Sequence, residues 1–109
     1  MPKGILCAIL ISTVGIGPAL ALDSKAYEGT WTGPHVKLII PAGIDKGAAS
    51  TYYYNGALQA PQMPTVQGNK VKLTNPSATY IVIGPAKGKS LPFFWTDGTH
   101  KFNTILAKQ

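Results

Sequence analysis

The sequence predicts an all-β fold: a small antiparallel meander of six to eight strands, closed as a barrel or packed as a sandwich. Three observations support this prediction. Short runs of apolar and polar residues alternate with the period of a strand. Turn signals, mostly glycine, proline and asparagine, separate these runs at intervals of roughly ten residues. Beyond the N-terminal segment, no run keeps its apolar residues at helical spacing.

Residues 1–21 have the composition of a secretory signal peptide. Lys3 supplies a positive start, residues 4–16 are apolar, and the Ala-Leu-Ala motif at 19–21 is a cleavage site of small residues. A membrane anchor is the alternative, but the apolar run is short for the roughly 20 residues that cross a bilayer. We therefore expect a periplasmic or secreted protein that does not span a membrane after cleavage, with residues 22–109 as a single β-barrel domain.

Cys7 is the only cysteine and lies in this leader, so we expect a mature domain without thiol or disulfide. Its stability must then come from packing and strand pairing. Without Lys3, nine lysines face four carboxylates, which gives a formal charge of +5. Because the lysines are scattered and arginine is absent, we expect them to keep strand edges soluble, and we expect no nucleic-acid partner.

The segment Tyr27–Ile40 is expected to form the first strand of the mature chain, with Trp31 as the anchor on which later strands close. Gly33-Pro34 interrupts this run, and a bulge or kink there would correct the phase between Trp31 and the alternation that follows. The side chains expected to share one face after this break are Val36, Leu38 and Ile40.

A second strand is expected over Ala48–Leu58, with three consecutive tyrosines at its centre and Asn55-Gly56 as a turn or hairpin signal. Because neighbouring side chains of a strand point to opposite faces, the three rings must occupy both faces. The proline-rich stretch Gln59–Pro64 is expected to be an irregular crossing or a sheet edge.

The C-terminal half has the clearest strand patterns. Lys70–Thr74 alternates polar with apolar residues, and Thr79–Ile83 is β-branched and aromatic throughout, as in a central strand. Ser90–Thr96 and Thr99–Lys108 flank Asp97-Gly98, a pair typical of a tight hairpin. The side chains expected to share a face are Val71 with Leu73, Leu91 with Phe93 and Trp95, and Phe102 with Thr104 and Leu106, whereas Phe94 takes the opposite face.

Gly29 and Trp31 form a Gly-x-Trp motif at the start of the first strand. This motif resembles the opening signature of lipocalin-like (calycin-type) β-barrels, which include small domains of exported bacterial proteins. In that family the tryptophan plugs one end of the barrel, and a basic side chain from the last strand lies across it. The resemblance implies this structural anchor for Gly29, Trp31 and Lys108, with a cation–π contact worth on the order of 1 kcal/mol. The chain departs from the family in its shorter length and in lacking the usual arginine.

The supply of catalytic groups is small, with four carboxylates and two histidines in the mature chain. No segment matches the motifs of serine hydrolases or zinc metalloproteases, so we expect neither an enzyme nor a cofactor. His35 and His100 fall on the first and last strands, which would be neighbours in a closed barrel. With Asp97 or Glu28 they could hold copper or zinc. We favour the alternative, in which both histidines lie on the surface and bind no metal.

Ten aromatic residues are many for a small domain, and core packing accounts for most of them. The runs Tyr52–Tyr54 and Phe93–Trp95, however, place adjacent rings on opposite faces, so the surplus rings line a cavity or form an exposed patch. The candidate ligand-binding residues are Tyr52, Tyr54, Phe94 and Trp95. The expected function is non-catalytic binding of a small apolar molecule or a glycan. The alternative is a protein-interaction or inhibitor module with a basic, aromatic surface.

Overall fold

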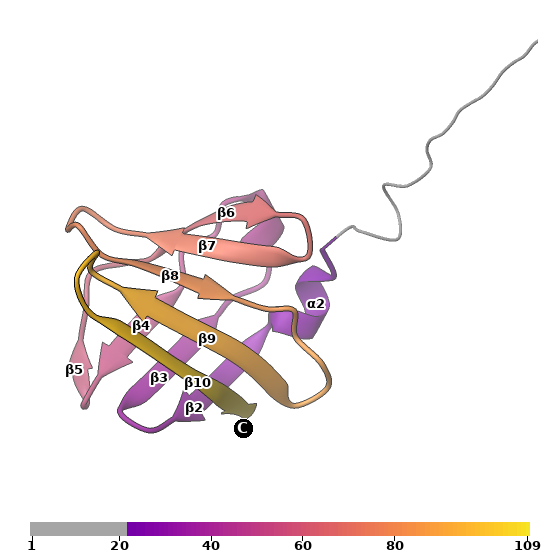
Figure 1. The fold of residues 1–109 in the computed structure, drawn as a ribbon. Helices are drawn as coiled ribbons and strands as arrows, with labels where there is room; N and C mark the ends of the chain where they lie inside the picture. The colour runs from indigo at the N-terminus through magenta and orange to yellow at the C-terminus, as the bar shows by residue number, and fades with distance from the viewer. Residues whose placement is uncertain (1–21) are drawn as a thin grey trace, which may run out of the picture.

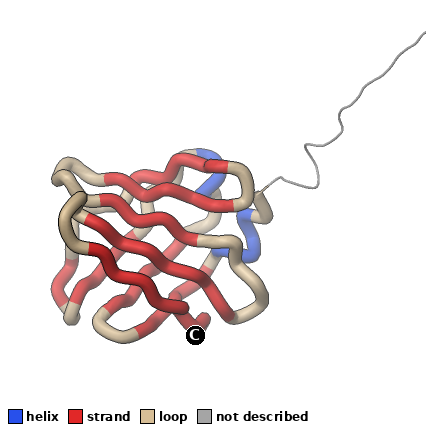
Figure 2. The backbone as a smooth tube through the Cα atoms, viewed as in Figure 1, coloured by secondary structure: helices blue, strands red, loops and turns tan. Residues whose placement is uncertain are grey.

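The computed structural model describes residues 22–109, so the expected signal peptide, residues 1–21, lies outside the described residues. Figure 1 shows one antiparallel β-sheet that curls into a half-barrel, and Figure 2 shows how little of the described chain is helical. The all-β antiparallel class is therefore confirmed. A four-residue helix, α2 (Ser24–Tyr27), precedes the sheet, and a short 3₁₀ turn, η1 (Ile44–Lys46), follows its second strand.

Nine strands form the sheet in the order β5-β4-β3-β2-β10-β9-β8-β7-β6, and every neighbouring pair is antiparallel. Consecutive strands are neighbours except β5 and β6, which lie at the two ends of the sheet. Strand β2 also pairs with β10, the last strand, and this pairing holds the two halves of the sheet together. The strands are β2 Gly29–Gly33, β3 Val36–Ile40, β4 Thr51–Tyr54, β5 Ala57–Leu58, β6 Met63–Gln67, β7 Lys70–Thr74, β8 Tyr80–Ile83, β9 Ser90–Thr96 and β10 Lys101–Lys108.

The two edges of the curled sheet, one near β4 and the other near β6, meet at one point. Ser50, just before β4, and Gln62, just before β6, form an antiparallel bridge with backbone N···O distances of 2.8 and 3.0 Å. Within residues 22–109, this bridge is the backbone pairing that joins β4 to β6, and no ladder continues it along the two strands. The half-barrel is thus joined at its seam by a single residue pair.

The nine strands correct the predicted count of six to eight. The run Tyr27–Ile40 contains two strands of a hairpin rather than one strand, because Pro34 and His35 reverse the chain and His35 adopts a φ of 65°. A further strand is β6, which pairs with β7 at a sheet edge, where Pro64 is tolerated because half of an edge strand's N–H groups need no partner. The last addition is the two-residue strand β5, which follows the Asn55-Gly56 turn.

Alternation along the strands places one face toward the core, as the sequence predicts. The buried side chains of the predicted sets are Val36, Leu38 and Ile40 on β3, Val71 and Leu73 on β7, and Leu91 and Phe93 on β9. On β10, Phe102, Thr104 and Leu106 are more buried than the residues between them, which are exposed. These face assignments are confirmed.

The half-barrel has two unlike ends. One, the α2 end, carries helix α2, the β6–β7 turn, the β8–β9 loop and the C-terminus (Figure 1). At the other, the pocket end, antiparallel pairing gathers four turns, which join β2 to β3, β4 to β5, β7 to β8 and β9 to β10. The predicted anchor residues lie at the α2 end, and the cavity described next opens at the pocket end.

Candidate ligand-binding site

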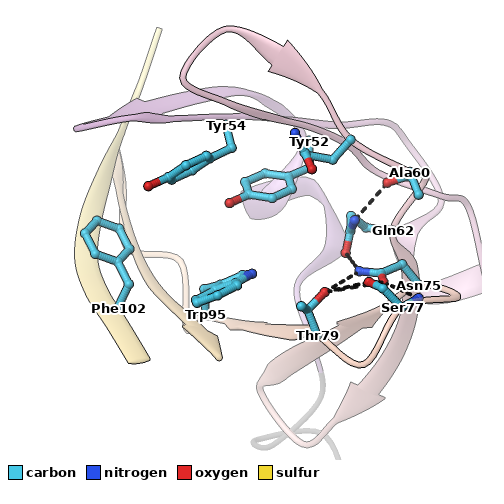
Figure 3. Close-up of a pocket in the computed structure, with 10 residues that line it drawn as sticks. Tyr52, Tyr54, Ala60, Gln62, Asn75, Ser77, Thr79, Trp95 and Phe102 are labelled. Carbon is cyan, nitrogen blue, oxygen red and sulfur yellow. Dashed lines mark hydrogen bonds between the residues drawn. The ribbon is translucent and has the colours of Figure 1, made fainter. Parts of the chain in front are cut away.

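A cavity of about 350 Å³, here called the mouth pocket, opens at the pocket end (Figure 3). Its volume is near the lower limit of the roughly 300–1,000 Å³ typical of small-molecule sites. The lining comes from both edges of the curled sheet and from the strands in its middle. The lining residues are Tyr52, Tyr54, Gln59, Ala60, Gln62, Asn75, Ser77, Thr79, Trp95 and Phe102.

Four aromatic side chains form the apolar part of the mouth pocket. Tyr52 and Tyr54 share a face because they are two residues apart on β4. Trp95 of β9 and Phe102 of β10 are directly opposite each other in the hairpin, so their rings also share a face. The buried Phe93 ring lies behind them, with its centroid 6.1 Å from that of Tyr52 and 6.3 Å from that of Phe102. Phe93 therefore supports rings from two distant strands.

A hydrogen-bonded group of polar side chains forms another side of the mouth pocket (Figure 3). Gln62 is 1% exposed; its Nε2 donates to the Ala60 carbonyl oxygen at 2.8 Å, and its Oε1 accepts from Asn75 Nδ2 at 3.0 Å. Asn75 Nδ2 also donates to Thr79 Oγ1 at 3.1 Å, and the Ser77 N–H donates to Asn75 Oδ1 at 2.9 Å. These bonds tie the β7–β8 loop to the segment before β6 and fix the orientation of both amides.

The mouth pocket is electrically neutral. Among the described residues that line it there is no lysine, histidine or carboxylate. Burial, and to a smaller extent the neighbouring Tyr54, raise the pKa of Tyr52 to about 12. The Tyr52 phenol is therefore uncharged at physiological pH and can donate a hydrogen bond.

Three of the four predicted ligand-binding residues, Tyr52, Tyr54 and Trp95, line the mouth pocket. The fourth, Phe94, lies on the outer face of β9, where its ring centroid is 6.4 Å from that of Tyr80 and where it lines a shallow outer groove. It differs from Trp95 because adjacent residues of a strand point to opposite faces. The four predicted residues thus do not form one site.

The sequence analysis missed seven of the ten lining residues. Phe102 had a usable signal, because a hairpin at Asp97-Gly98 places a residue of the last strand opposite Trp95. The polar group had none, since its members lie in or beside loops, where no strand period marks the inward face. The missed polar residues are Gln59, Gln62, Asn75, Ser77 and Thr79.

At the α2 end, the predicted anchor residues are in contact. Trp31 is 0% exposed, and its Nε1 donates to the Tyr27 carbonyl oxygen at 2.9 Å. Lys108 lies directly opposite Trp31 across β2 and β10, and its Nζ is 5.5 Å from the ring centroid. A Cβ added at Gly29, whose φ is 132°, would lie 2.8 Å from Lys108 Cε. Glycine therefore leaves the space through which the lysine stem crosses the tryptophan.

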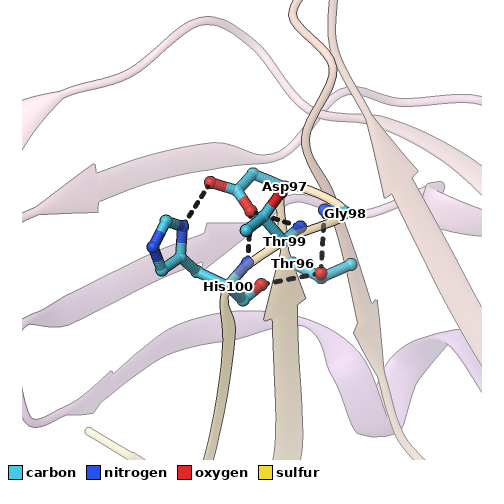
Figure 4. Close-up of polar contacts among 5 residues, drawn as sticks. All are labelled: Thr96, Asp97, Gly98, Thr99 and His100. Carbon is cyan, nitrogen blue, oxygen red and sulfur yellow. Dashed lines mark hydrogen bonds and ion pairs between the residues drawn. The ribbon is translucent and has the colours of Figure 1, made fainter.

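The two histidines lie in different turns of the pocket end. His35 Nδ1 is 2.7 Å from Asn55 Oδ1, whereas His100 Nδ1 is 3.0 Å from Asp97 Oδ2 (Figure 4). Asp97 Oδ1 also accepts from the N–H groups of His100 and Thr99, at 2.6 and 2.9 Å. These hydrogen bonds, chiefly those from His100, lower the pKa of Asp97 to about 2. Within residues 22–109, no three histidine or carboxylate side chains come together as a metal site.

In the described part of the chain, no helix has the length and apolar character needed to cross a membrane. No protein-family model, curated protein or solved structure matches the sequence or the fold. The functional assignment therefore depends on the geometry of the mouth pocket.

Proposed function

We propose that this chain is an exported, non-catalytic binding domain that holds one small uncharged molecule in the mouth pocket. The observation that carries the proposal is the lining, in which four aromatic rings face a mutually hydrogen-bonded group of amides and hydroxyls. Concave sites that combine apolar area with a few fixed polar groups are typical of small-molecule binding. Export is supported by the signal-like composition of residues 1–21.

A lipocalin-like barrel is the fold relationship that we propose for this function. Its support is the contact of Trp31 with Lys108, beside the Gly29 of the Gly-x-Trp motif, at the α2 end. Because Trp31 fills that end, a ligand would enter from the opposite one, where the mouth pocket opens. The two ends then have separate roles, one structural and one for binding.

Binding without catalysis is proposed because the lining offers rings, amides and hydroxyls but no group suited to proton transfer near neutral pH. The contact between the side chains of Asp97 and His100 lies outside this lining. Both residues belong to one exposed turn, where the His100 side chain is 75% exposed and Asp97 already accepts two backbone hydrogen bonds. The proximity of Asp97 and His100 follows from their positions in the β9–β10 turn, and it needs no catalytic role to account for it.

Native mass spectrometry of the protein isolated from the cells that make it, compared with its denatured mass, tests the proposal. We expect an additional non-covalent mass that is released on denaturation. Trp95→Ala should lose this mass, whereas Phe94→Ala should retain it, because Phe94 is the adjacent ring on the outer face. A bound mass that survives Trp95→Ala would place the ligand elsewhere, and a bare wild-type monomer that also binds no small molecule added to it would contradict the proposal.

A second candidate function is protein interaction through the outer surface, and one observation favours it. The nine strands carry no carboxylate, and four of their lysines alternate with inward-facing residues and so lie on the outer face: Lys37, Lys70, Lys72 and Lys101. Lys37 Nζ lies 5.4 Å from the ring centroid of Tyr53, and Lys72 Nζ lies 4.5 Å from that of Tyr80. Such a basic, aromatic face suits an acidic partner. A captured partner that is lost on Lys72→Glu, together with an empty mouth pocket, would favour this function over ligand binding.

A further inference from the structure

We infer that the molecule held in the mouth pocket is a neutral carbohydrate, bound with one apolar face of a sugar ring against Trp95. This inference rests on the proposed function and narrows it from small uncharged molecules to one chemical class. A pyranose ring has two C–H faces and a rim of hydroxyl groups that donate and accept hydrogen bonds. The mouth pocket presents the complementary arrangement of rings and polar groups.

The aromatic side chains form a slot for a flat ring. Figure 3 shows Tyr52 and Tyr54 on one side of the hollow and Trp95 on the other, with Phe102 beside them. A sugar ring in this slot has an aromatic neighbour on each face, which removes its C–H groups from water. A long acyl chain fits less well, because the cavity is about 350 Å³ and Trp31 fills the other end of the half-barrel.

The polar group can still both donate and accept hydrogen bonds. Gln62 Nε2 uses one hydrogen on the Ala60 carbonyl oxygen, which leaves a second, and its Oε1 accepts one bond from Asn75, which leaves a lone pair. The Tyr52 hydroxyl and the Trp95 indole N–H add donors on the aromatic side. Sugar hydroxyls can use donors and acceptors at once, whereas a hydrocarbon ligand would cover them without replacing their water, at a cost in affinity.

The neutrality of the lining selects against ligands that carry charge. Among residues 22–109, the lining supplies no counter-charge for a carboxylate, a phosphate or an ammonium group. Such a ligand would lose hydration on entry without gaining an ion pair. Among sugars of one size, we therefore expect the neutral ones to bind more tightly than a hexuronic acid or a hexosamine.

The test is a titration of the purified exported protein with neutral mono- and disaccharides at millimolar concentrations. A hexuronic acid, a hexosamine and a fatty alcohol serve as comparison probes. Tryptophan fluorescence follows binding, and because Trp31 is buried at the α2 end, the change reports on Trp95. We expect saturable binding of at least one neutral sugar, with affinity about tenfold or more above that of its charged analogues.

Calorimetric titration of variants locates the sugar. Tyr52→Phe should weaken sugar binding about fivefold, because the ring stays and only one hydroxyl is lost. Trp95→Ala should weaken it about tenfold or more, because the ring that contacts the sugar is removed. Tyr53→Phe and Phe94→Ala remove the same kinds of group from the outer face and should leave the affinity unchanged. Because Tyr52→Phe keeps the packed ring, it remains informative even where Trp95→Ala disturbs folding.

Each outcome decides the inference. Binding of the fatty alcohol without binding of any neutral sugar would overturn the carbohydrate class and leave the proposed function standing. If the wild type, Tyr52→Phe and Trp95→Ala bound the sugar with equal affinity, the sugar would not lie between these rings, and the proposed binding position would be wrong. A protein that is isolated without a bound mass and that binds none of the probes would overturn both the inference and the proposed function.

Discussion

Trp31 is fully buried at the α2 end and lies beneath Lys108, so we expect the stability of this end to depend on it. Trp31→Ala should lower the free energy of unfolding by about 3–5 kcal/mol, the range for truncating a large buried aromatic side chain. Urea denaturation followed by circular dichroism measures the loss. Trp95→Ala is the control, since Trp95 is only partly buried and lines an open pocket. A Trp31→Ala protein as stable as the wild type would contradict the role of Trp31 as a plug.

Asp97 should make the stability of the protein depend on pH in the acid range. Its pKa falls from 3.8 to about 2 in the folded protein, chiefly through the backbone N–H of His100. A carboxylate whose pKa is depressed by folding stabilises the folded state above its unfolded pKa, and that contribution is lost as the pH falls through the folded value. Between pH 3.8 and about 2, the melting temperature of the wild type should therefore fall by an amount that Asp97→Asn does not show.

His100→Ala separates the two contributions of His100 to this pH dependence. The variant loses the imidazole but keeps the backbone N–H, which is the largest cause of the lowered pKa of Asp97. Most of the acid-induced fall in melting temperature should remain. A pH profile as flat as that of Asp97→Asn would show that the imidazole, rather than the backbone, holds the carboxylate.

Single residues differ in how well the sequence predicts their place. Trp95 and Phe94 have opposite orientations that follow from alternation alone, so the inner and outer faces of β9 were predictable. Gln62 was not, because its burial results from the bridge to Ser50, a contact between segments that no local pattern links. Local periodicity therefore predicts orientation within a strand but not which loops meet.

At the scale of elements, the β2–β3 hairpin shows why the strand count was too low. A proline at the second position of a turn and a positive φ at the third is the pattern of a type II turn, which favours glycine or asparagine at the third position. Here His35 occupies that position with a φ of 65°. Without the expected glycine after Pro34, the sequence pattern favoured a bulge in a continuous strand over a reversal.

The same geometry predicts a stabilising substitution. His35→Gly should raise the free energy of unfolding by about 1 kcal/mol, because glycine adopts a positive φ without the steric cost that a Cβ brings. Thermal and urea denaturation measure the gain. His35→Ala is the matched control: both variants lose the contact with Asn55, but His35→Ala keeps the strain of a Cβ at positive φ and should therefore be destabilised. Equal stability of the two variants would show that the turn is not strained at His35.

Strands β9 and β6 illustrate what a pattern can and cannot predict for an element. In β9, the sequence analysis placed Leu91 and Phe93 on one face, and in the structure both are buried between less buried neighbours. Strand β6 is exposed at four of its five positions and contains Pro64, so its composition resembles that of a loop. Its extended form comes from pairing with β7, which is a property of the sheet and not of the segment.

At the scale of the whole molecule, the mouth pocket lies across the seam of the half-barrel. Tyr52 and Gln62 belong to the two segments that meet at this seam, and Asn75 and Trp95 come from farther round the sheet. A ligand in the pocket would therefore contact both segments of the seam, at which the single Ser50–Gln62 bridge lies. Binding and closure of the half-barrel should then be coupled.

Hydrogen exchange measures this coupling directly. The N–H groups of Ser50 and Gln62 both donate across the bridge, and an isolated pair opens more readily than a long ladder. Without ligand, these two amides should exchange faster than those of the β9–β10 ladder, which pairs seven residues of each strand. Bound ligand should slow them, whereas amides of β5, at the sheet edge outside the pocket lining, should be unaffected. Bridge amides that are already as protected as the ladder without ligand would mean that the seam is closed independently of binding.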